Sequence, residues 1–303
     1  MLEQLDKIRW SELRDCYGTS ESIPDLIREL ISRDSKLQAQ ALDELANRIC
    51  HQATRYQATA PAVPFLLYLA RSSKTLNRDR ILSLLQAIAI GLDFDQLYFQ
   101  TKVDDEIAEL KRQAAIMTER QRRELNWGPA SDLDCYCSVR EGVPCFIKLL
   151  GDKDRSVRIH AGYNLAWFPA DHRKSLPRLR ERVKSVRHTA ELAMTILSVG
   201  LLEFQASVSR TSKSLVRPFL TDRRELMRFT AALYLYWHDR DEVVLSHLRE
   251  LSQREDYDSY VGSNSIPFAG YSWNQYAARL IDLHEASNAG NKAVSRSRQS
   301  SRL

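Results

Sequence analysis

Two helix-like segments follow one another near the middle of the chain: Val143-Pro-Cys-Phe-Ile-Lys-Leu-Leu150 and Asp154-Arg-Ser-Val-Arg-Ile-His-Ala-Gly-Tyr-Asn-Leu-Ala166. The first predicts a short amphipathic helix with a proline in its first turn, where the missing N–H removes no intrahelical hydrogen bond. The second predicts a longer helix, because Asp154 is a good N-cap and Val157 and Ala161 recur at helical spacing. Residues 143–166 therefore encode a helix pair.

The same pair recurs along the chain. Proline-led segments of the first kind begin at Ile23, Val63, Val143 and Leu176. Looser copies of the second kind begin at Asp34, Val186 and Asp222. The prolines at positions 24, 64, 144, 177 and 218 are separated by 40, 80, 33 and 41 residues, about one or two helix pairs. Since no pair can bury its apolar side alone, this repetition predicts helix pairs stacked into a solenoid.

The pattern resembles the HEAT-repeat family, whose units are antiparallel helix pairs with a proline in the first helix and an Asp-x-x-Val-Arg-x-x-Ala opening in the second. The similarity covers about 22–92 and 140–285, and residues 143–168 match closely. The junction over 42–66, with His51-Gln, Tyr56, Ala58-Thr-Ala and Val63-Pro-Phe-Leu, is more narrowly similar to bacterial-type HEAT-repeat proteins. The resemblance implies an all-α, right-handed solenoid of HEAT-like helix pairs, and it implies no particular chemistry.

Composition agrees with a helical globular protein. With 44% hydrophobic and 27% charged residues, the 303-residue chain is close to the globular average, which excludes general disorder and a fibrous class. Ten glycines and nine prolines are too few for the many turns of a strand-rich sandwich or barrel. The net charge of +5 comes from interspersed charges, so it permits nucleic acid as a partner without requiring it.

Cysteine usage and the absence of an apolar leader predict a cytoplasmic protein. The five cysteines, at positions 16, 50, 135, 137 and 145, have neither the spacing of a disulfide framework nor that of a zinc site. We therefore expect buried or idle thiols, no metal and no cofactor. The first ten residues lack the apolar region of a signal peptide, and no run approaches the roughly 18 apolar residues of a membrane span.

Residues 1–285 are expected to form one domain with an insertion at about 93–139. Within the insertion an apolar stripe predicts a long, partly exposed helix over 101–127: Val103, Ile107, Leu110, Ala114 and Met117. A loop-like stretch over 126–137 follows it. The insertion is either a lid or partner-docking arm, or a degenerate repeat.

Two further departures from the repeat pattern lie near the end of the chain. Residues 254–272 predict a long loop, whose length is typical of functional or disordered segments. Helix is expected again over 273–284, and residues 286–303 predict a flexible basic tail.

The second helix of each pair is expected to line the concave side of the solenoid, so its polar and aromatic residues are the candidate ligand-binding residues. They are His51, Tyr56, His160, Asn164, Trp167, Arg228, Tyr234, Trp237, Trp273 and Tyr276. His160 and Asn164 are four residues apart and share a helix face. In the other interpretation, which is preferred for each residue taken singly, the side chain caps or fills a junction between repeats. The same structural role is preferred for His51 and Tyr56, which lie on either side of a helix end.

Three classes of function remain. The first is a binding scaffold that presents a concave groove to a protein or peptide. The second is an enzyme with a concave aromatic pocket, by resemblance to HEAT-type alkylpurine DNA glycosylases and phycobilin lyases, which would act on a damaged base or a small molecule with Glu191, His238 or Asp239 as its catalytic candidates. The third is nucleic-acid binding, for which no base-reading motif is present. Because the common catalytic and metal motifs are missing, whether the chain is an enzyme stays open.

Overall fold

The computed structural model describes residues 1–91, 102–254 and 274–286. Within them nearly all regular structure is helical, and the single sheet pairs β1 (Arg14–Asp15) with β2 (Gly18–Thr19) in antiparallel register. Short 3-10 helices are η1 (Leu2–Lys7), η2 (Trp10–Glu12), η3 (His51–Ala53), η4 (Pro169–Asp171) and η5 (Arg217–Thr221). The fold is all-helical and repeat-like.

The stacked α-helices come in successive pairs along the chain. In the first half they are α1 (Ile23–Glu29), α2 (Ser35–Ile49), α3 (Thr59–Arg71) and α4 (Arg78–Ile90). After the insertion they are α9 (Val143–Leu149), α10 (Arg155–Leu165), α11 (His172–Ser185), α12 (Thr189–Gln205), α13 (Lys213–Val216), α14 (Glu225–Tyr236) and α15 (Glu242–Ser252). Residues 274–286 form a last helix, where the sequence predicts one over 273–284.

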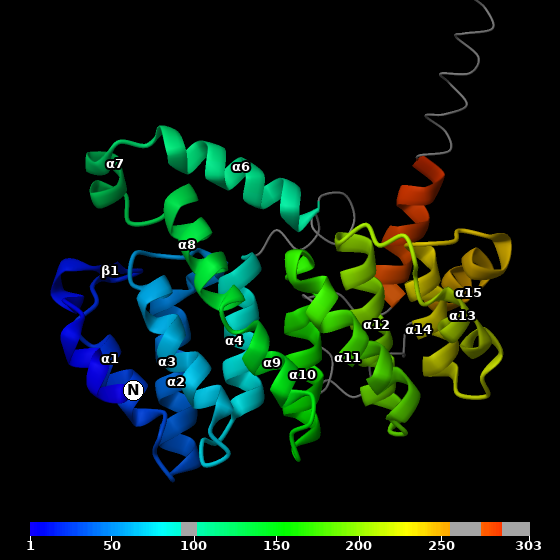
Figure 1. Cartoon of the computed structure of the whole chain (residues 1–303), viewed down its shortest axis with the longest axis horizontal. Helices are drawn as coiled ribbons and strands as arrows, with labels where there is room; N and C mark the ends of the chain where they lie inside the picture. The colour runs from blue at the N-terminus through cyan, green and yellow to red at the C-terminus, as the bar shows by residue number, and fades with distance from the viewer. Residues whose placement is uncertain (92–101, 255–273, 287–303) are drawn as a thin grey trace, which may run out of the picture.

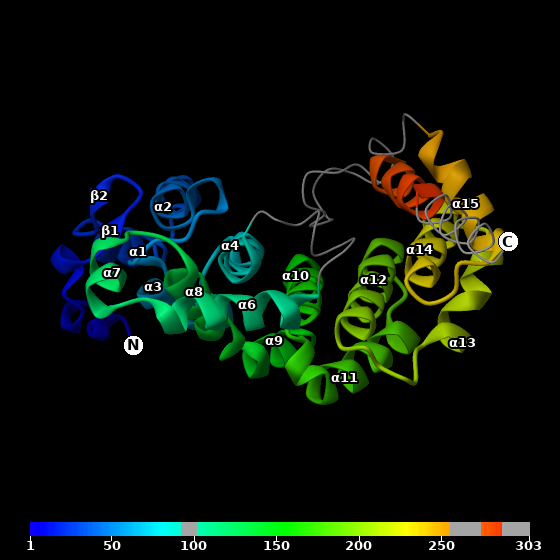
Figure 2. The same ribbon diagram turned by 90° about the horizontal axis from the view of Figure 1, so that it is seen from above.

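The pairs form two layers that follow an arc (Figure 1). Figure 2 shows α2, α4, α10, α12 and α14 along the inner side of the arc and α1, α3, α9 and α11 along its outer side. Along the inner side α10 contacts α4 and α12, and α12 contacts α14. The buried apolar residues form one continuous cluster from Leu5 to Leu280. The stack therefore shares its core from pair to pair.

Two inner helices, α2 and α10, have the N-terminal caps that the sequence pattern predicts, whereas α14 begins after Arg224 rather than after Asp222. The Asp34 carboxylate accepts hydrogen bonds from the backbone N–H groups of Lys36 and Leu37, at 2.9 and 3.2 Å. The Asp154 carboxylate accepts one from the N–H of Ser156 at 2.9 Å. These bonds satisfy backbone donors that a helix leaves unpaired in its first turn.

Two of the proline-led helices begin earlier than their prolines suggest. α3 begins at Thr59 and α11 at His172, so Pro64 and Pro177 lie inside these helices. Each proline is the sixth residue of its helix, where its ring removes one bond to the first turn and leaves the later turns intact. In the fifth pair α13 ends at Val216 and the chain continues as η5, with Pro218 as its second residue, where the missing N–H of proline removes no hydrogen bond within the helix.

The insertion differs from its prediction in two respects. The expected long helix over 101–127 is divided into α6 (Val103–Ile116) and α7 (Glu119–Glu124), because Thr118 forms a reciprocal capping box with Gln121 and starts a new helix. The stretch expected to be a loop contains α8 (Pro129–Arg140), which begins after Gly128 at a positive φ of 138°.

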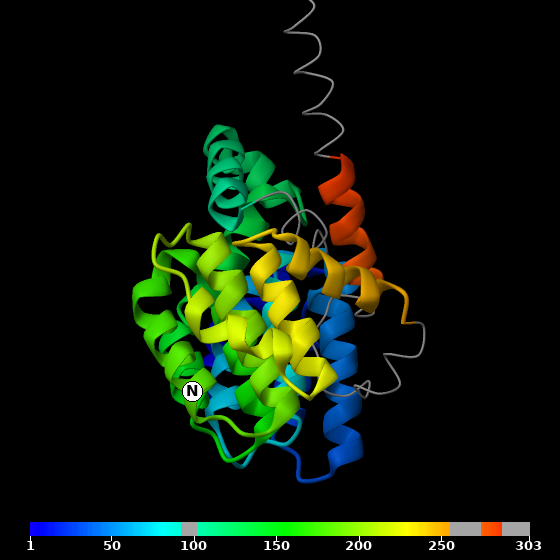
Figure 3. The same ribbon diagram turned by 90° about the vertical axis from the view of Figure 1, so that its right-hand side faces the viewer.

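The three insertion helices take different places in the fold. α8 packs against α3 and α4, and its Cys135, Tyr136 and Val139 are buried in the shared core. α6 packs on α8 and lies outside the two layers, while α10 contacts α4 directly. Figure 3, seen along the stack, shows α6 and the helix 274–286 extending from the same edge of it. The insertion thus extends the stack through α8 and projects from it through α6 and α7.

Close helix packing in the second half depends on Gly200 of α12. A Cβ at this position would lie 2.5 Å from Cδ2 of Tyr234 and 2.8 Å from Cζ3 of Trp237. Both distances are far below van der Waals contact, so α12 and α14 approach as they do because residue 200 has no side chain.

Candidate functional site

A groove lies between α2 and α4 on the inner side of the arc (Figure 2). It has a volume of about 240 Å³ and is lined by Leu42, Asp43, Ala46, Arg80, Ser83, Leu84 and Ala87. Ser83 and Ala87 are four residues apart on α4 and therefore share one face of that helix. Their small side chains, together with Ala46 on α2, leave the space between the two helices open.

The groove combines an apolar floor with one charged pair. Leu42 and Leu84 are buried, with 2% and 8% of their surface exposed. Arg80 and Asp43 form an ion pair across the groove, and their side chains are 43% and 63% exposed. An exposed pair of this kind contributes only about 0–1 kcal/mol. Arg80 and Asp43 can therefore leave this ion pair and bind charged groups of a partner at little cost in free energy.

The predicted residues His51 and Tyr56 lie at the junction between α2 and α3. The ring of His51 lies 6.3 Å from that of Tyr17, and Tyr56 is buried with 9% of its surface exposed. The Thr59 hydroxyl donates to the Ile49 carbonyl at the end of α2 and accepts from the Tyr56 N–H at 2.8 Å. Thr59, which sequence reasoning did not single out, thus bonds the end of one helix to the start of the next.

His160, Asn164 and Trp167 follow one another along α10 and its C-terminal turn. Asn164 is 1% exposed, and its amide donates to the carbonyls of Leu82 and His160, each at 2.9 Å. His160 Nδ1 is 2.9 Å from the Ser156 carbonyl oxygen. Trp167 is fully buried with its ring at right angles to that of Tyr163, 5.8 Å between centroids. Asn164 thereby joins α10 to α4 and Trp167 fills the core beside it.

Glu191, a candidate catalytic carboxylate, is held by two arginines. Its two oxygens accept from Arg158 at 2.7 Å each, and one also accepts from Arg182. Burial raises the pKa of Glu191, but the hydrogen bonds and charges of the arginines outweigh burial and bring it below its ordinary value. A carboxylate that is ionised and fully paired is poorly suited to donate a proton, so this geometry favours a role in joining α10 to α12.

Arg228 repeats the backbone contacts of Arg158 in a later pair. Arg158 donates to the carbonyls of Asp152 and Lys153, at 2.8 and 3.0 Å. Arg228 donates to the carbonyl of Asp222 at 3.1 Å. Each guanidinium closes the connection in front of its own inner helix, and this shared role accounts for an arginine at both positions.

Two of the predicted residues, Tyr234 and His238, lie beside a buried carboxylate in α12. Glu203 accepts hydrogen bonds from the hydroxyls of Tyr234 and Ser212, each at 2.6 Å, and from Arg180 at 2.7 Å. His238 Nε2 lies 3.7 Å from a Glu203 oxygen. Burial lowers the pKa of His238, so its imidazole is neutral at pH 7, and burial raises that of Tyr234.

Sequence reasoning found Tyr234 and His238 and missed Glu203 and Arg180. The available signal was a single acid inside the apolar run Ile196–Phe204, because a buried carboxylate requires partners.

The remaining candidates lie at the end of the stack. Trp237 is half-buried and stacks on Phe204 with 6.5 Å between ring centroids. Asp239 is ion-paired with Arg217 at 3.1 Å. Tyr276 is buried with 1% of its surface exposed, and Trp273 lies outside the described residues. The structure thus brings Trp237 near Tyr234 and His238 and leaves Trp167 in an earlier pair. Residues 255–272 of the long loop predicted over 254–272 also lie outside the described residues.

The five cysteines are free thiols with different accessibility. Cys137 is exposed, whereas Cys135 is fully buried. Burial raises the pKa of Cys50 and of Cys145 to about 11, so both stay protonated at neutral pH.

We expect iodoacetamide at pH 8 to modify Cys137 first and Cys135 last in the native protein, because the reagent needs an accessible thiolate. Peptide mapping over time measures the order. Early modification of Cys135 would contradict the packing of α8 described above, and the urea-unfolded chain, in which all five thiols should react alike, is the control.

Over residues 1–91, 102–254 and 274–286, no group of three or more His, Cys, Asp or Glu side chains is arranged to hold a metal ion. None of the described helices combines the length and the apolar character that crossing a membrane requires.

Comparison with known proteins adds no assignment: no family model matches the chain, and a search of curated proteins finds no relative. The class that the structure defines is therefore an all-helical, repeat-like protein with an open groove between two inner helices.

Proposed function

We propose that the chain is a binding scaffold, a right-handed solenoid of HEAT-like helix pairs that takes a peptide segment of a protein partner in the groove between α2 and α4. The observation that carries the proposal is the groove itself, with small side chains along its walls and leucines at its floor. Peptides bind helical grooves by inserting apolar anchor side chains, while polar groups at the rim set their orientation. Asp43 and Arg80 supply such a rim.

The catalytic candidates are already paired with or packed beside other side chains, and this also supports binding over catalysis. Glu191 and Asp239 are ion-paired with arginines, and His238 lies beside the fully bonded Glu203. By contrast, Ser83 and Ala46 of the groove are open to a partner, since they line its free volume. A peptide with apolar anchors flanked by one basic and one acidic residue would match both the floor and the two rim charges.

The test is to capture the partner from native extract on the immobilised chain, identify it, and measure its affinity for three forms of the protein. Ser83→Arg places a long charged side chain in the groove, and we expect it to weaken binding at least about tenfold, the effect of losing one well-packed anchor. Ser185→Arg is the matched control, because Ser185 is an exposed serine near the end of the outer helix α11. Wild-type affinity in the Ser83→Arg protein would exclude the groove as the binding site.

A further inference from the structure

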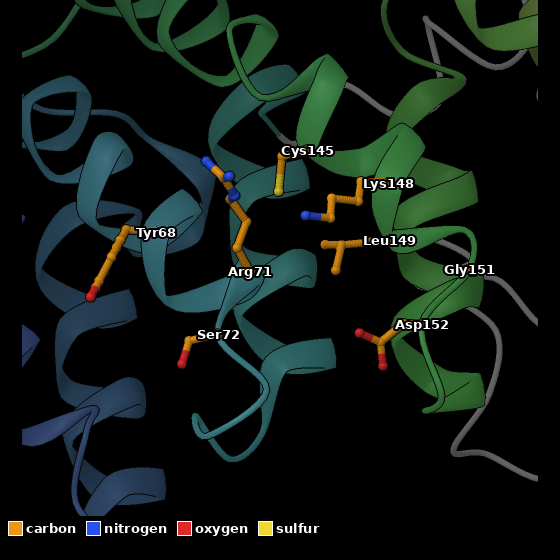
Figure 4. Close-up of a pocket in the computed structure, with 8 residues that line it drawn as sticks. All are labelled: Tyr68, Arg71, Ser72, Cys145, Lys148, Leu149, Gly151 and Asp152. Carbon is orange, nitrogen blue, oxygen red and sulfur yellow. The ribbon is translucent and has the colours of Figure 1, made fainter.

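A second pocket opens between the C-terminal ends of α3 and α9, on the outer layer of the stack (Figure 4). Its volume is about 470 Å³, within the range of about 300–1,000 Å³ that is typical of small-molecule sites. Arg71 and Ser72 come from the end of α3, and Cys145 and Lys148 come from α9. Nothing in the scaffold proposal uses this pocket.

The pocket carries an uncompensated positive charge. Its one acid, Asp152, is held by Arg78 through two parallel hydrogen bonds of 2.7 and 2.8 Å. That pairing holds the pKa of Asp152 below its ordinary value and cancels its charge. Arg71 and Lys148 form no ion pair with any acid in the part of the chain that the structure describes. Two cations therefore remain without a counter-charge.

The position of the cations at helix ends does not by itself account for their arrangement. A basic residue in the last turn of a helix interacts favourably with the helix dipole. Arg71 in α3, Lys148 in α9 and Lys184 in α11 all have this position. Only the first two, however, line one pocket. Figure 4 shows the Lys148 side chain extending toward Cys145 and Arg71, so the two charges come from different helices to the same space.

The rest of the lining is suited to an organic group. Leu149 and Cys145 are buried, at 5% and 9% exposed, and form an apolar wall. Burial raises the pKa of Cys145 to about 11 although Arg71 and Lys148 act to lower it, so the thiol is neutral beside the two cations. Tyr68 adds an exposed aromatic ring at the edge.

We infer that this pocket binds a small organic phosphate monoester. Its phosphoryl group accepts hydrogen bonds from the Arg71 guanidinium and the Lys148 ammonium, and its organic part lies against Leu149 and Tyr68. A phosphate monoester carries a charge of about −1.5 to −2 at pH 7, which two cations neutralise and a monovalent carboxylate would match less well. An arginine fork presents paired N–H donors to phosphate oxygens, and a lysine adds a point charge.

Titration calorimetry with phenyl phosphate at low salt tests the inference. We expect saturable binding that weakens as salt is added, because exposed charges are screened. Arg71→Gln and Lys148→Gln should each weaken it about tenfold or more, the effect of losing a hydrogen bond to a charged group. Arg71→Lys, which keeps the charge, should retain more affinity than Arg71→Gln. Arg71 and Lys148 are both exposed and unpaired in the described structure, so the melting temperatures of the three variants should stay at the wild-type value.

Lys184→Gln is the matched control, since it removes an exposed last-turn lysine outside the pocket and should bind as the wild type does. Two other ligands test which parts of phenyl phosphate the pocket recognises. Benzoate, which lacks the phosphoryl group, should bind more weakly than phenyl phosphate, and so should inorganic phosphate, which has no organic part. The inference is overturned if phenyl phosphate shows no saturable binding, if the glutamine variants bind it as well as Lys184→Gln does, or if benzoate or inorganic phosphate binds equally well.

Discussion

Replacing Trp167 by alanine is expected to lower the free energy of unfolding by about 3–5 kcal/mol, the usual cost of removing a buried tryptophan. Trp167 is fully buried at the C-terminal turn after α10, and its ring meets that of Tyr163 edge-on. The indole lies in the middle of the stack, where the core is shared between successive pairs. The cavity would therefore weaken the packing on both sides of it, since each pair depends on its neighbours.

Urea denaturation followed by circular dichroism measures this loss. Trp127→Ala is the matched control, because Trp127 is 62% exposed in the insertion and its removal should change stability by no more than about 0.5 kcal/mol. A Trp167→Ala protein as stable as Trp127→Ala would show that residue 167 does not occupy the core. Trp167→Phe should lie between the two, since phenylalanine refills part of the cavity.

Glu191→Ala should also cost about 3–5 kcal/mol, because it leaves buried charge without a partner. Glu191 is 4% exposed and binds both Arg158 of α10 and Arg182 of α11, so its removal leaves two guanidinium groups beside α12 uncompensated. In the control, Glu181→Ala breaks an ion pair with Arg178 whose side chains are 64% and 70% exposed, and the expected change is about 0–1 kcal/mol. Equal losses in the two variants would refute the structural role of Glu191.

The same carboxylate predicts a difference in acid sensitivity. The pKa of Glu191 is lower in the folded chain than its ordinary value of 4.5. Its stabilising contribution is therefore present above pH 4.5 and is lost as the pH falls through the lowered folded value. Between neutral pH and pH 3, wild-type stability should fall more steeply than that of Glu191→Ala. Parallel pH profiles would show that Glu191 titrates alike in the folded and unfolded chains.

Much of the fold could be predicted because its signals are local. Asp34 and Asp154 cap helices as their positions indicate, since a cap depends on neighbours two or three residues away. The sequence pattern places the start of α3 too late, because it treats Pro64 as a first-turn proline although Pro64 is the sixth residue of the helix. α8 was missed because its apolar residues face α3 and α4, contacts that no local pattern reveals.

The candidate site was harder to predict than the helices. The residues selected as ligands were large and polar, yet Asn164 and Arg228 mainly bond to backbone carbonyls of the stack. The groove is instead lined by small residues such as Ala46 and Ser83, which carry no chemical signal of their own. They become informative only when α2 and α4 lie side by side.

The chain's own pattern of prolines, caps and apolar spacings was sufficient to specify a succession of helix pairs, because helix formation and capping act over a few residues. The meeting of Arg71 with Lys148 and of α2 with α4 came from packing between pairs, and that of Glu203 with Arg180 came from packing between the two helices of one pair. Those contacts join residues far apart in sequence, and they depend on the curvature and spacing of the assembled stack, quantities that no short segment contains.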